Sequence, residues 1–250
     1  MSDSENGHRS AATSRIAAVG DLHCTVESGG RLQELFTRAS AEADVIALCG
    51  DLTDYGLPEE AHILVNELAR TVKIPILAVL GNHDFESGKQ AEVEAILAEA
   101  GVVVLDGGSH EIGEVGFVGV KGFCGGFGRR TLEPWGEPMI KEFVREAVNE
   151  GMKLESGLAR LRTAQRVALL HYAPIEGTVA GEPPEIFPFL GSSRLEEPLN
   201  RYAVAAVFHG HAHRGAPEGR TREGIPVYNV AAPLLRRLTP EAPPFRIVAI

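Results

Sequence analysis

No apolar run in the sequence approaches the roughly 18 residues that a membrane-spanning helix requires, so we expect no membrane segment. The polar N-terminus also lacks the apolar middle of a secretory signal, which predicts a disordered tail over residues 1–14 of a cytoplasmic protein. Cysteine is scarce, with three residues and no Cys-x-x-Cys pair, and this argues against a disulfide framework. Cys24 and Cys124 therefore have no predicted role.

Basic residues are in the minority: 24 Lys and Arg against 34 Asp and Glu leave a formal net charge of −10. Non-specific binding to nucleic acid depends on basic side chains that neutralise phosphates, so a nucleic-acid polymer is disfavoured as a partner. Metal ligands account for part of this acidity if bound cations offset their charge. The 250 residues, 44% of them hydrophobic, suffice for a large core, and we expect one domain over residues 15–250.

The first half of the chain alternates between apolar strand-like runs and amphipathic helical patterns. We expect strands at 15–20, 45–49 and 74–80, and helices at 32–43, 58–71 and 88–100. This alternation is typical of βαβ units, in which helices pack on the faces of the sheet. Ligands of such sheets gather beyond the carboxyl ends of the strands.

The second half has a different pattern. Short strands expected at 102–105, 110–112 and 115–120 are separated by turns that contain glycine, which favours antiparallel pairing. The further expected elements are a glycine-rich loop at 122–128, a long polar helix at 136–163, and strands at 166–170, 204–208, 226–230 and 245–250. One domain with two sheets is the simplest architecture for this order.

Five short segments at the ends of predicted strands contain five of the nine histidines. They are Asp21-Leu22-His23, Gly50-Asp51, Gly81-Asn82-His83-Asp84, His171 and Gly210-His211-Ala212-His213. Asp, Asn and His are the residue types that bind two divalent metals side by side. A lone histidine at a strand end is more often structural, but the five segments together predict a metal centre.

The spacing within the first segments indicates how ligands are shared. Two metals about 3.5–4 Å apart need a carboxylate that bridges them. Asp51 is the natural bridge, because it follows Gly50 at the point where the strand ends and the backbone turns. Asp21 and His23 lie on one face if their segment is extended, so both can reach one ion.

The later segments add neutral ligands and a proton carrier. His211 and His213 are two residues apart and point the same way in an extended turn. Asn82 offers a neutral amide oxygen, which limits the total ligand charge. His83 and Asp84 form a pair in which the carboxylate can orient the imidazole for proton transfer.

In this order, the segments resemble the calcineurin-like metallophosphoesterase superfamily over residues 21–213, and the compact size resembles its small bacterial phosphodiesterase branch. The resemblance implies an α/β (α+β) fold with two facing mixed β-sheets flanked by helices, a four-layer αββα sandwich. It also implies two metal ions, manganese, iron or zinc. The implied ligands are Asp21, His23, Asp51 and His213 for one ion, and Asp51, Asn82, His171 and His211 for the other.

The resemblance further implies a phosphoester hydrolase in which a metal-bridging hydroxide attacks phosphorus. His83 would contact the phosphate or protonate the leaving oxygen, with Asp84 behind it. We favour a phosphodiesterase that acts on a small or nucleotide-like substrate; a phosphomonoesterase and a pyrophosphate-cleaving hydrolase are the alternatives. A non-catalytic metal-binding scaffold is an alternative of another class, against which the unliganded His83 argues. The oligomeric state, a dimer included, stays open.

Substrate contacts are expected from loops over the metals. In the loop 122–130, Phe127 can stack on a ring of the substrate, and Arg129 and Arg130 can bind phosphate. A flexible connection with solvated arginines explains the same loop equally well. The segment 176–190 is rich in Pro and Gly and is expected to form a long loop of the kind that acts as a lid.

Three residues beside the segments have two interpretations each, and a fourth has no expected role in catalysis. Arg214 follows the last histidine and can reach an anionic substrate or pair with an acidic neighbour. Tyr172 follows His171 and either rims the pocket or packs beneath it. Asp54 either supports a ligand from behind or caps a turn. His209 is expected to pack inside the protein.

Overall fold

Alternate side chains of the strand β1 (Arg15–Val19) pack into two different hydrophobic cores in the computed structural model of the protein. Ala17 and Val19 face a layer of helices, whereas Ile16 and Ala18 face a second sheet. A parallel sheet that is covered on both faces requires apolar residues at every position. This requirement explains the continuous apolar run that predicts the strand.

The first sheet has the spatial order β11-β1-β2-β3-β4. The strands β1 to β4 run parallel to one another, and β11 pairs antiparallel with β1. The bounds of the further strands are Val45–Cys49 for β2, Ile76–Val79 for β3, Val103–Val104 for β4 and Arg246–Ala249 for β11.

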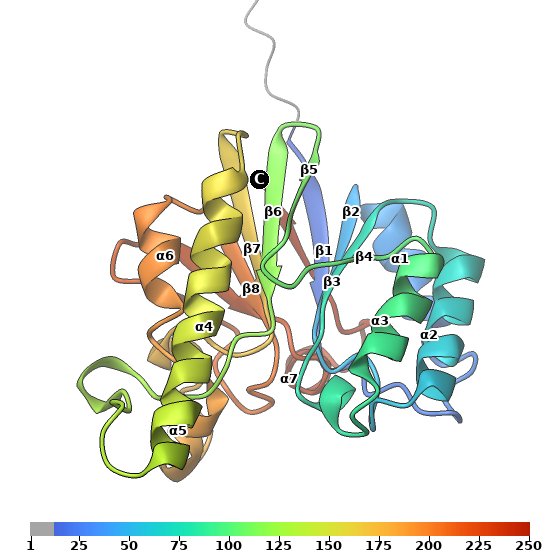
Figure 1. The fold of residues 1–250 in the computed structure, drawn as a ribbon. Coiled ribbons are helices and arrows are strands. Elements are labelled where there is room, and N and C mark those ends of the chain that lie inside the picture. Colours follow the sequence, from blue (N-terminus) through green and yellow to red (C-terminus); the bar gives the residue numbers. More distant parts are fainter. Residues whose placement is uncertain (1–12) are drawn as a thin grey trace, which may run out of the picture.

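Helices α1 (Gln33–Glu42), α2 (Pro58–Thr71) and α3 (Gln90–Glu99) cover the outer face of this sheet (Figure 1). Their inward faces supply fully buried side chains such as Phe36 and Leu64. Burial of one such side chain stabilises the fold by roughly 1.5–3 kcal/mol. The helix α2 begins at a proline, whose fixed φ suits the first helical position.

The second sheet has the spatial order β5-β6-β7-β8-β10-β9. The inner strands β6, β7, β8 and β10 run parallel, and the edge strands β5 and β9 pair antiparallel with their neighbours. The bounds are Ser109–Ile112 for β5, Val115–Val120 for β6, Gln165–Leu170 for β7, Ala206–His209 for β8, Glu218–Arg220 for β9 and Pro226–Asn229 for β10.

Helices α4 (Pro138–Arg160) and α6 (Glu196–Arg201) pack on the outer face of the second sheet (Figure 1). Two short helices, α5 (Phe187–Leu190) and α7 (Ala232–Leu238), lie in the connections. The layers therefore run helices, sheet, sheet, helices, which confirms the four-layer sandwich. Across residues 13–250, no helix combines the length and the apolar content needed to span a membrane.

Two details of the sequence-based topology are wrong. The strand predicted at 102–105 forms β4, which adds parallel to β3 in the first sheet because α3 returns the chain as a crossover connection. Antiparallel pairing holds only between β5 and β6 in this region. The strand β9 and the helices α5, α6 and α7 were not predicted, since each is short and weakly periodic.

The structure describes residues 13–250, so most of the predicted tail, residues 1–12, lies outside the described residues. Ser14 had been placed in that tail, but its backbone pairs with the last residue of the chain. Ser14 N–H donates to Ile250 O at 3.1 Å, and Ile250 N–H donates to Ser14 O at 2.9 Å. Ser14 is therefore part of the described fold.

Candidate metal centre

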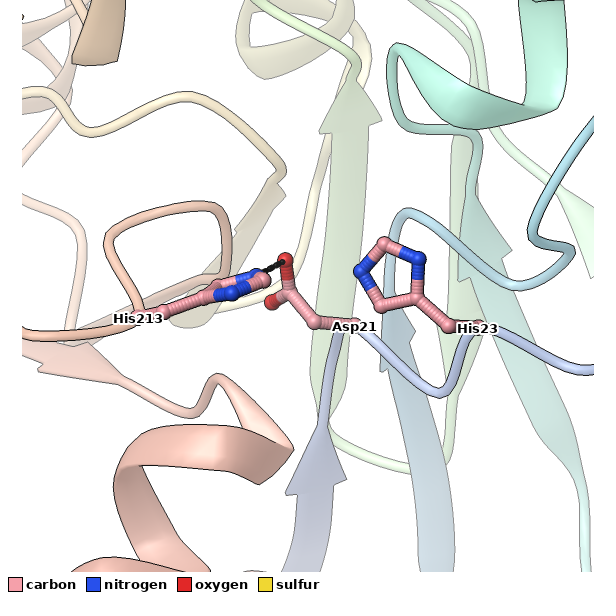
Figure 2. Close-up of side chains that lie close together, drawn as sticks. All are labelled: Asp21, His23 and His213. Atoms are coloured by element: carbon pink, nitrogen blue, oxygen red, sulfur yellow. Dashed lines mark hydrogen bonds and ion pairs between the residues drawn. The ribbon is translucent and has the colours of Figure 1, made fainter.

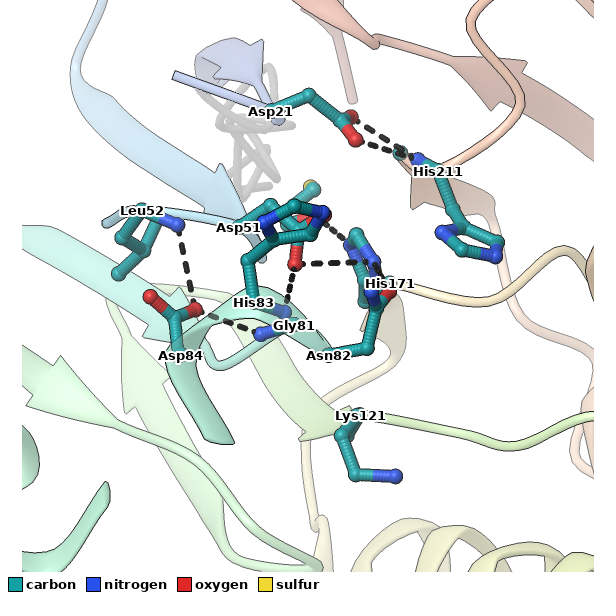
Figure 3. Close-up of polar contacts among 12 residues, drawn as sticks. Asp21, Asp51, Leu52, Gly81, Asn82, His83, Asp84, Lys121, His171 and His211 are labelled. Carbon is teal, nitrogen blue, oxygen red and sulfur yellow. Dashed lines mark hydrogen bonds and ion pairs between the residues drawn. The ribbon is translucent and has the colours of Figure 1, made fainter. Parts of the chain in front are cut away.

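The five motif segments meet beyond the carboxyl ends of β1, β2 and β3 of the first sheet and of β7 and β8 of the second (Figure 3). Both sheets therefore contribute to one edge of the sandwich. Each segment begins within two residues of its strand, where the backbone leaves the sheet. Carboxyl ends of parallel strands are the usual place for a ligand site in such sheets. The fold therefore explains why residues far apart in the sequence lie together.

Asp21, His23 and His213 form the first group, in which one ligand atom of each lies within 4.8 Å of the others (Figure 2). The buried Asp21 carboxylate places Oδ1 at 2.8 Å from His213 Nε2, and both of its oxygens accept the backbone N–H of His211. Burial acts to raise the pKa of Asp21, but the hydrogen bond with His213 and the neighbouring histidines lower this pKa overall. The group thus contains an ionised carboxylate.

Asp51, His171 and His211 form the second group (Figure 3). The His171 side chain is fully buried, and its Nδ1–H donates to Cys49 O at 3.0 Å. Burial lowers the pKa of His171 and keeps the imidazole neutral, so its Nε2 carries a lone pair. That nitrogen lies 3.3 Å from Asp51 Oδ1 and 2.9 Å from Asn82 Oδ1.

Hydrogen-bond acceptors of Asp51, Asn82 and His171 thus face one another with no donor hydrogen between them. A carboxylate, an amide oxygen and the unprotonated nitrogen of an imidazole all accept, and none of them donates. A cation at their meeting point resolves this arrangement. Oxygen and imidazole nitrogen are ligands that suit manganese, iron and zinc. The donor set of Asp51, Asn82 and His171 therefore fits a divalent metal.

His23 gives a second indication of the same kind. Its Nδ1–H donates to Asp54 Oδ1 at 3.0 Å, which favours the interpretation of Asp54 as a group that supports a ligand from behind. The opposite nitrogen, Nε2, is buried and has no hydrogen-bond partner among the described residues. A buried nitrogen without a partner is destabilising unless a ligand completes it. His23 therefore presents a lone pair to the first group.

Asp51 lies between the two groups. Its Oδ1 is 3.3 Å from His171 Nε2, and its Oδ2 is 3.9 Å from His23 Nε2. Burial, and then the charge of Asp21, raise the pKa of Asp51 to about 6. The two carboxylates therefore repel each other across the centre, and cations placed between them would remove this repulsion.

His83 lies outside these two groups but forms a third cluster with His23 and Asp54, whose ligand atoms also lie within 4.8 Å of one another. Its backbone N–H donates to Asp51 Oδ1 at 2.8 Å, and its Nδ1–H donates to Asp54 O at 2.7 Å. The His83 ring meets the edge of the His23 ring with a centroid separation of 4.6 Å. Because Nδ1 is engaged by a carbonyl, Nε2 of this half-buried imidazole is free to hold or release a proton.

The expected contact between Asp84 and the His83 ring is absent in the described structure. Asp84 is fully buried and accepts hydrogen bonds from Leu52 N, Thr53 N, Thr53 Oγ1 and Gly81 N at 2.6–3.2 Å. A short carboxylate so close to its own backbone turn is drawn to these N–H donors, which outnumber the single imidazole. Asp84 therefore joins the loop after β2 to the loop after β3 and holds the ligand segments in place.

Comparison with known proteins now adds to this geometry. A family model described as calcineurin-like phosphoesterase matches residues 14–215. The chain belongs to the calcineurin-like phosphoesterase family. It is a phosphoester hydrolase, and its clusters of Asp and His can bind metal. No curated protein matches the sequence.

Solved structures share the fold of this phosphoesterase at low sequence identity. Phosphopantetheinyl hydrolase from Mycobacterium tuberculosis has a TM-score of 0.68 at 16% identity, covering 95% of this chain and 96% of its own. A Thermus thermophilus protein has a TM-score of 0.57 at 17% identity, covering 89% and 91%. A putative 5'-nucleotidase from Staphylococcus aureus has a TM-score of 0.53 at 16% identity, covering 87% of this chain and 48% of its own.

The backbone of the phosphoesterase centre is not extended, in contrast to the sequence-based expectation. Asp21, His23, Asp51 and His211 have positive φ angles of 55°, 45°, 47° and 68°. Non-glycine residues rarely adopt this region, and such strain concentrates at functional sites. The curled backbone also separates the pair that was expected to point the same way: His213 joins Asp21, and His211 joins His171.

Glycines in the motifs make room for the ligands. A Cβ at Gly81 would collide with the backbone and carboxylate of Asp51, and one at Gly210 would collide with the carboxylate of Asp21. Gly81 and Gly210 therefore have a steric reason, which is the close approach of a carboxylate that follows a neighbouring strand.

The two segments expected to form loops over the phosphoesterase centre pack together through a shared hydrophobic cluster. Phe127, expected to stack on substrate, is buried against Ala173, Val179, Leu190 and Ala212. The segment 176–190, expected to be a loop, contains two 3₁₀ turns and α5. Phe127 is buried because apolar side chains from both segments pack into one hydrophobic cluster.

The remaining expected substrate residues lie around the centre in different ways. Tyr172 is buried, and its ring packs 4.5 Å from that of His211, so it belongs to the wall of the centre. Arg129 and Arg130 are exposed, and Arg130 lines a cavity of about 260 Å³ beside Phe127. Arg214 has an exposed side chain, and its backbone N–H donates to Glu182 Oε1 at 2.6 Å. Their contact with substrate stays a prediction.

Sequence reasoning missed Lys121, which lies at the same edge of the sandwich (Figure 3). Lys121 follows directly after β6, and this position at a strand end is what it shares with the motif segments. His209 behaves as expected: it is buried, with Nδ1 at 2.8 Å from Gly210 O and Nε2 at 2.8 Å from Thr178 Oγ1.

Proposed function

We propose that this phosphoesterase is a dinuclear metal-dependent phosphodiesterase that acts on a small or nucleotide-like substrate. The observation that carries the proposal is the position of Asp51. It directs one carboxylate oxygen to His171 and the other to His23, at 3.3 and 3.9 Å. A carboxylate placed in this way is the shared ligand that a two-metal site requires.

The two ions would be manganese, iron or zinc, and each would take its ligands from one side of Asp51. Asp21, His23, Asp51 and His213 would hold the first ion, and Asp51, Asn82, His171 and His211 the second. When bound, such ions lower the pKa of water and stabilise negative charge on phosphoryl oxygens. Asp54 and the Cys49 carbonyl fix the tautomers of His23 and His171, so each imidazole presents Nε2.

His83 is proposed to carry the proton that the leaving oxygen needs. Burial acts to lower its pKa, but the hydrogen bond to Asp54 O and the charges of Asp51 and Asp54 raise this pKa above the ordinary value. The second proton of the imidazole therefore resides on Nε2, which has no hydrogen-bond partner among residues 13–250. From there it can contact a phosphoryl oxygen and then transfer to the departing ester oxygen.

The open side of the centre supports a diester over a monoester. His213 leaves 38% of its side chain exposed, and His23 leaves 22% exposed. A diester carries substituents on both sides of phosphorus, and an open centre accommodates both. The acidic balance of the chain, with its net charge of −10, supports a small substrate over a nucleic-acid polymer.

A pair of chromogenic esters tests the proposal. Hydrolysis of bis(p-nitrophenyl) phosphate and of p-nitrophenyl phosphate is measured with added Mn²⁺, Fe²⁺ or Zn²⁺. We expect kcat/KM for the diester to exceed that for the monoester. A preference for the monoester would replace the diesterase by a phosphomonoesterase. Absence of any hydrolysis at saturating metal would instead support a non-catalytic scaffold.

A further inference from the structure

Two segments of the protein, residues 132–140 and 186–189, expose several large apolar side chains. Trp135 and Met139 are the most exposed, at 76% and 79%. The whole set, called the apolar rim below, consists of Leu132, Trp135, Met139, Ile140, Ile186 and Phe189. Single apolar side chains on a surface are common, but a group of this size indicates an interaction site.

Gly125 joins the two segments of the apolar rim. Its N–H donates to Pro188 O, and its carbonyl accepts the N–H of Leu132, at 2.7 Å each. The second segment also contacts the candidate metal centre, because Phe189 O accepts the Nε2–H of His211 at 3.2 Å. The apolar rim is therefore one surface, and it lies beside the centre.

The first turn of α4 is exposed on all sides. Every residue from 132 to 142 is exposed, and this turn projects from the body of the protein together with the loop before it (Figure 1). Pro134 and Pro138 restrict the backbone of this stretch, which lowers the entropy cost of holding Trp135 in a contact. Trp and Met are also enriched at protein interfaces.

The size of the apolar rim matches one half of a protein interface. Its side chains expose on the order of 700 Å², against the roughly 800 Å² that each partner buries in a standard interface. The largest apolar patch of a typical monomer measures only about 300–600 Å². The area therefore suffices for a stable contact between two protein molecules.

The charges around the apolar rim favour one kind of partner. Exposed basic and acidic side chains alternate here: Arg129, Arg130, Lys141 and Arg145 with Glu133, Glu137 and Glu142. Among them, only Glu133 forms an ion pair within residues 13–250, with Arg194 at 3.7 Å. In a two-fold contact the surface meets itself, so a basic residue of one copy can face an acidic residue of the other. A lipid surface instead attracts a clear excess of basic side chains, which the rim lacks.

We propose that the apolar rim binds a second copy of this chain in a two-fold symmetric contact. Trp135 and Met139 of each copy are covered by the other copy. Because Phe189 belongs to the rim and its carbonyl holds His211, the contact borders the metal centre of each copy. The inference does not depend on which phosphoester the centre hydrolyses.

Sedimentation of the full chain at about 0.1 to 100 µM measures its oligomeric state. We expect wild type to be a dimer at the upper end of this range. Trp135 is the only tryptophan of the chain, so its fluorescence emission should shift to shorter wavelength as the dimer forms. Wild type that stays a monomer at the highest concentration would overturn the inference.

Met139→Glu and Met152→Glu separate the apolar rim from the rest of α4. Met152 is also exposed, at 63%, and lies about 20 Å farther along the helix, so neither substitution disturbs the core. We expect Met139→Glu to weaken the dimer about tenfold or more, and Met152→Glu to leave it unchanged.

Two further results would overturn the inference. A dimer of equal strength in Met139→Glu and wild type would place the contact elsewhere on the protein. A monomeric wild type whose tryptophan emission shifts only on vesicles of phosphatidylcholine and phosphatidylglycerol would assign the apolar rim to a lipid surface.

Discussion

The substitution Asp84→Asn tests whether Asp84 holds the ligand segments together or acts as the partner of His83. The Asp84 carboxylate is fully buried. Its Oδ1 accepts Thr53 N–H at 2.8 Å and the Thr53 hydroxyl at 2.6 Å, and its Oδ2 accepts Leu52 N–H at 3.2 Å and Gly81 N–H at 2.7 Å. Asparagine has the same shape but only one accepting oxygen.

The magnitude follows from the donors that the amide cannot satisfy. In Asp84→Asn, either orientation of the new side chain sets an NH₂ group against two donors, which leaves these donors unpaired at a cost of roughly 1–3 kcal/mol each. Burial, the largest influence, raises the pKa of Asp84, so removal of its charge offsets part of this loss. We expect the free energy of unfolding to fall by about 2–4 kcal/mol.

Three measurements on this variant decide between the two roles. Urea unfolding should show the loss of stability, metal content should fall because the loops after β2 and β3 separate, and the pH profile of residual kcat should keep its shape. Glu92→Gln, an exposed carboxylate on α3, is the matched control and should change none of the three. Wild-type stability and metal content with a lower kcat and a shifted pH profile would instead show that Asp84 acts as the partner of His83.

Three further outcomes are expected. His83→Ala should lower kcat by about 10²–10⁴-fold with metal content unchanged, and loss of metal would contradict its placement outside the ligand groups. Gly81→Ala should weaken metal binding and cost roughly 1–3 kcal/mol in urea unfolding, because its Cβ meets Asp51; wild-type values would show that the turn relaxes. Burial lowers the pKa of His209 to about 4. Since the unfolded state takes up this proton below about pH 6.5, stability should fall by about 3 kcal/mol from pH 6.5 to 4, and His209→Asn should lose less over that range.

The sequence predicted the sandwich and the ligand groups because both depend on local patterns. Continuous apolar runs locate the buried strands, and strand–helix alternation places their carboxyl ends at one edge. The segment 45–49 and the helix 58–71 have the predicted bounds. The ligand groups then follow, since Asp21 and Asp51 come directly after the first two strands.

What the sequence did not predict depends on contacts between distant segments. Asp84 was paired with its neighbour His83, but three of the four donors that hold it come from the loop after β2. The sequence left the role of Phe127 open between substrate contact and a plain connection, and its burial against side chains of other segments, such as Leu190, depends on the fold. Lys121 carries no motif, and only the fold brings its ammonium beside Tyr172. Composition and spacing contain none of this information.

The most direct test of the central claim is the metal content of Asp51→Asn, measured by elemental analysis together with its hydrolysis of bis(p-nitrophenyl) phosphate. We expect about two metal ions per wild-type chain, with both metal and activity lost in the variant, because Asp51 faces ligands of both groups. Full hydrolysis by an Asp51→Asn protein without bound metal would rule out Asp51 as the shared ligand.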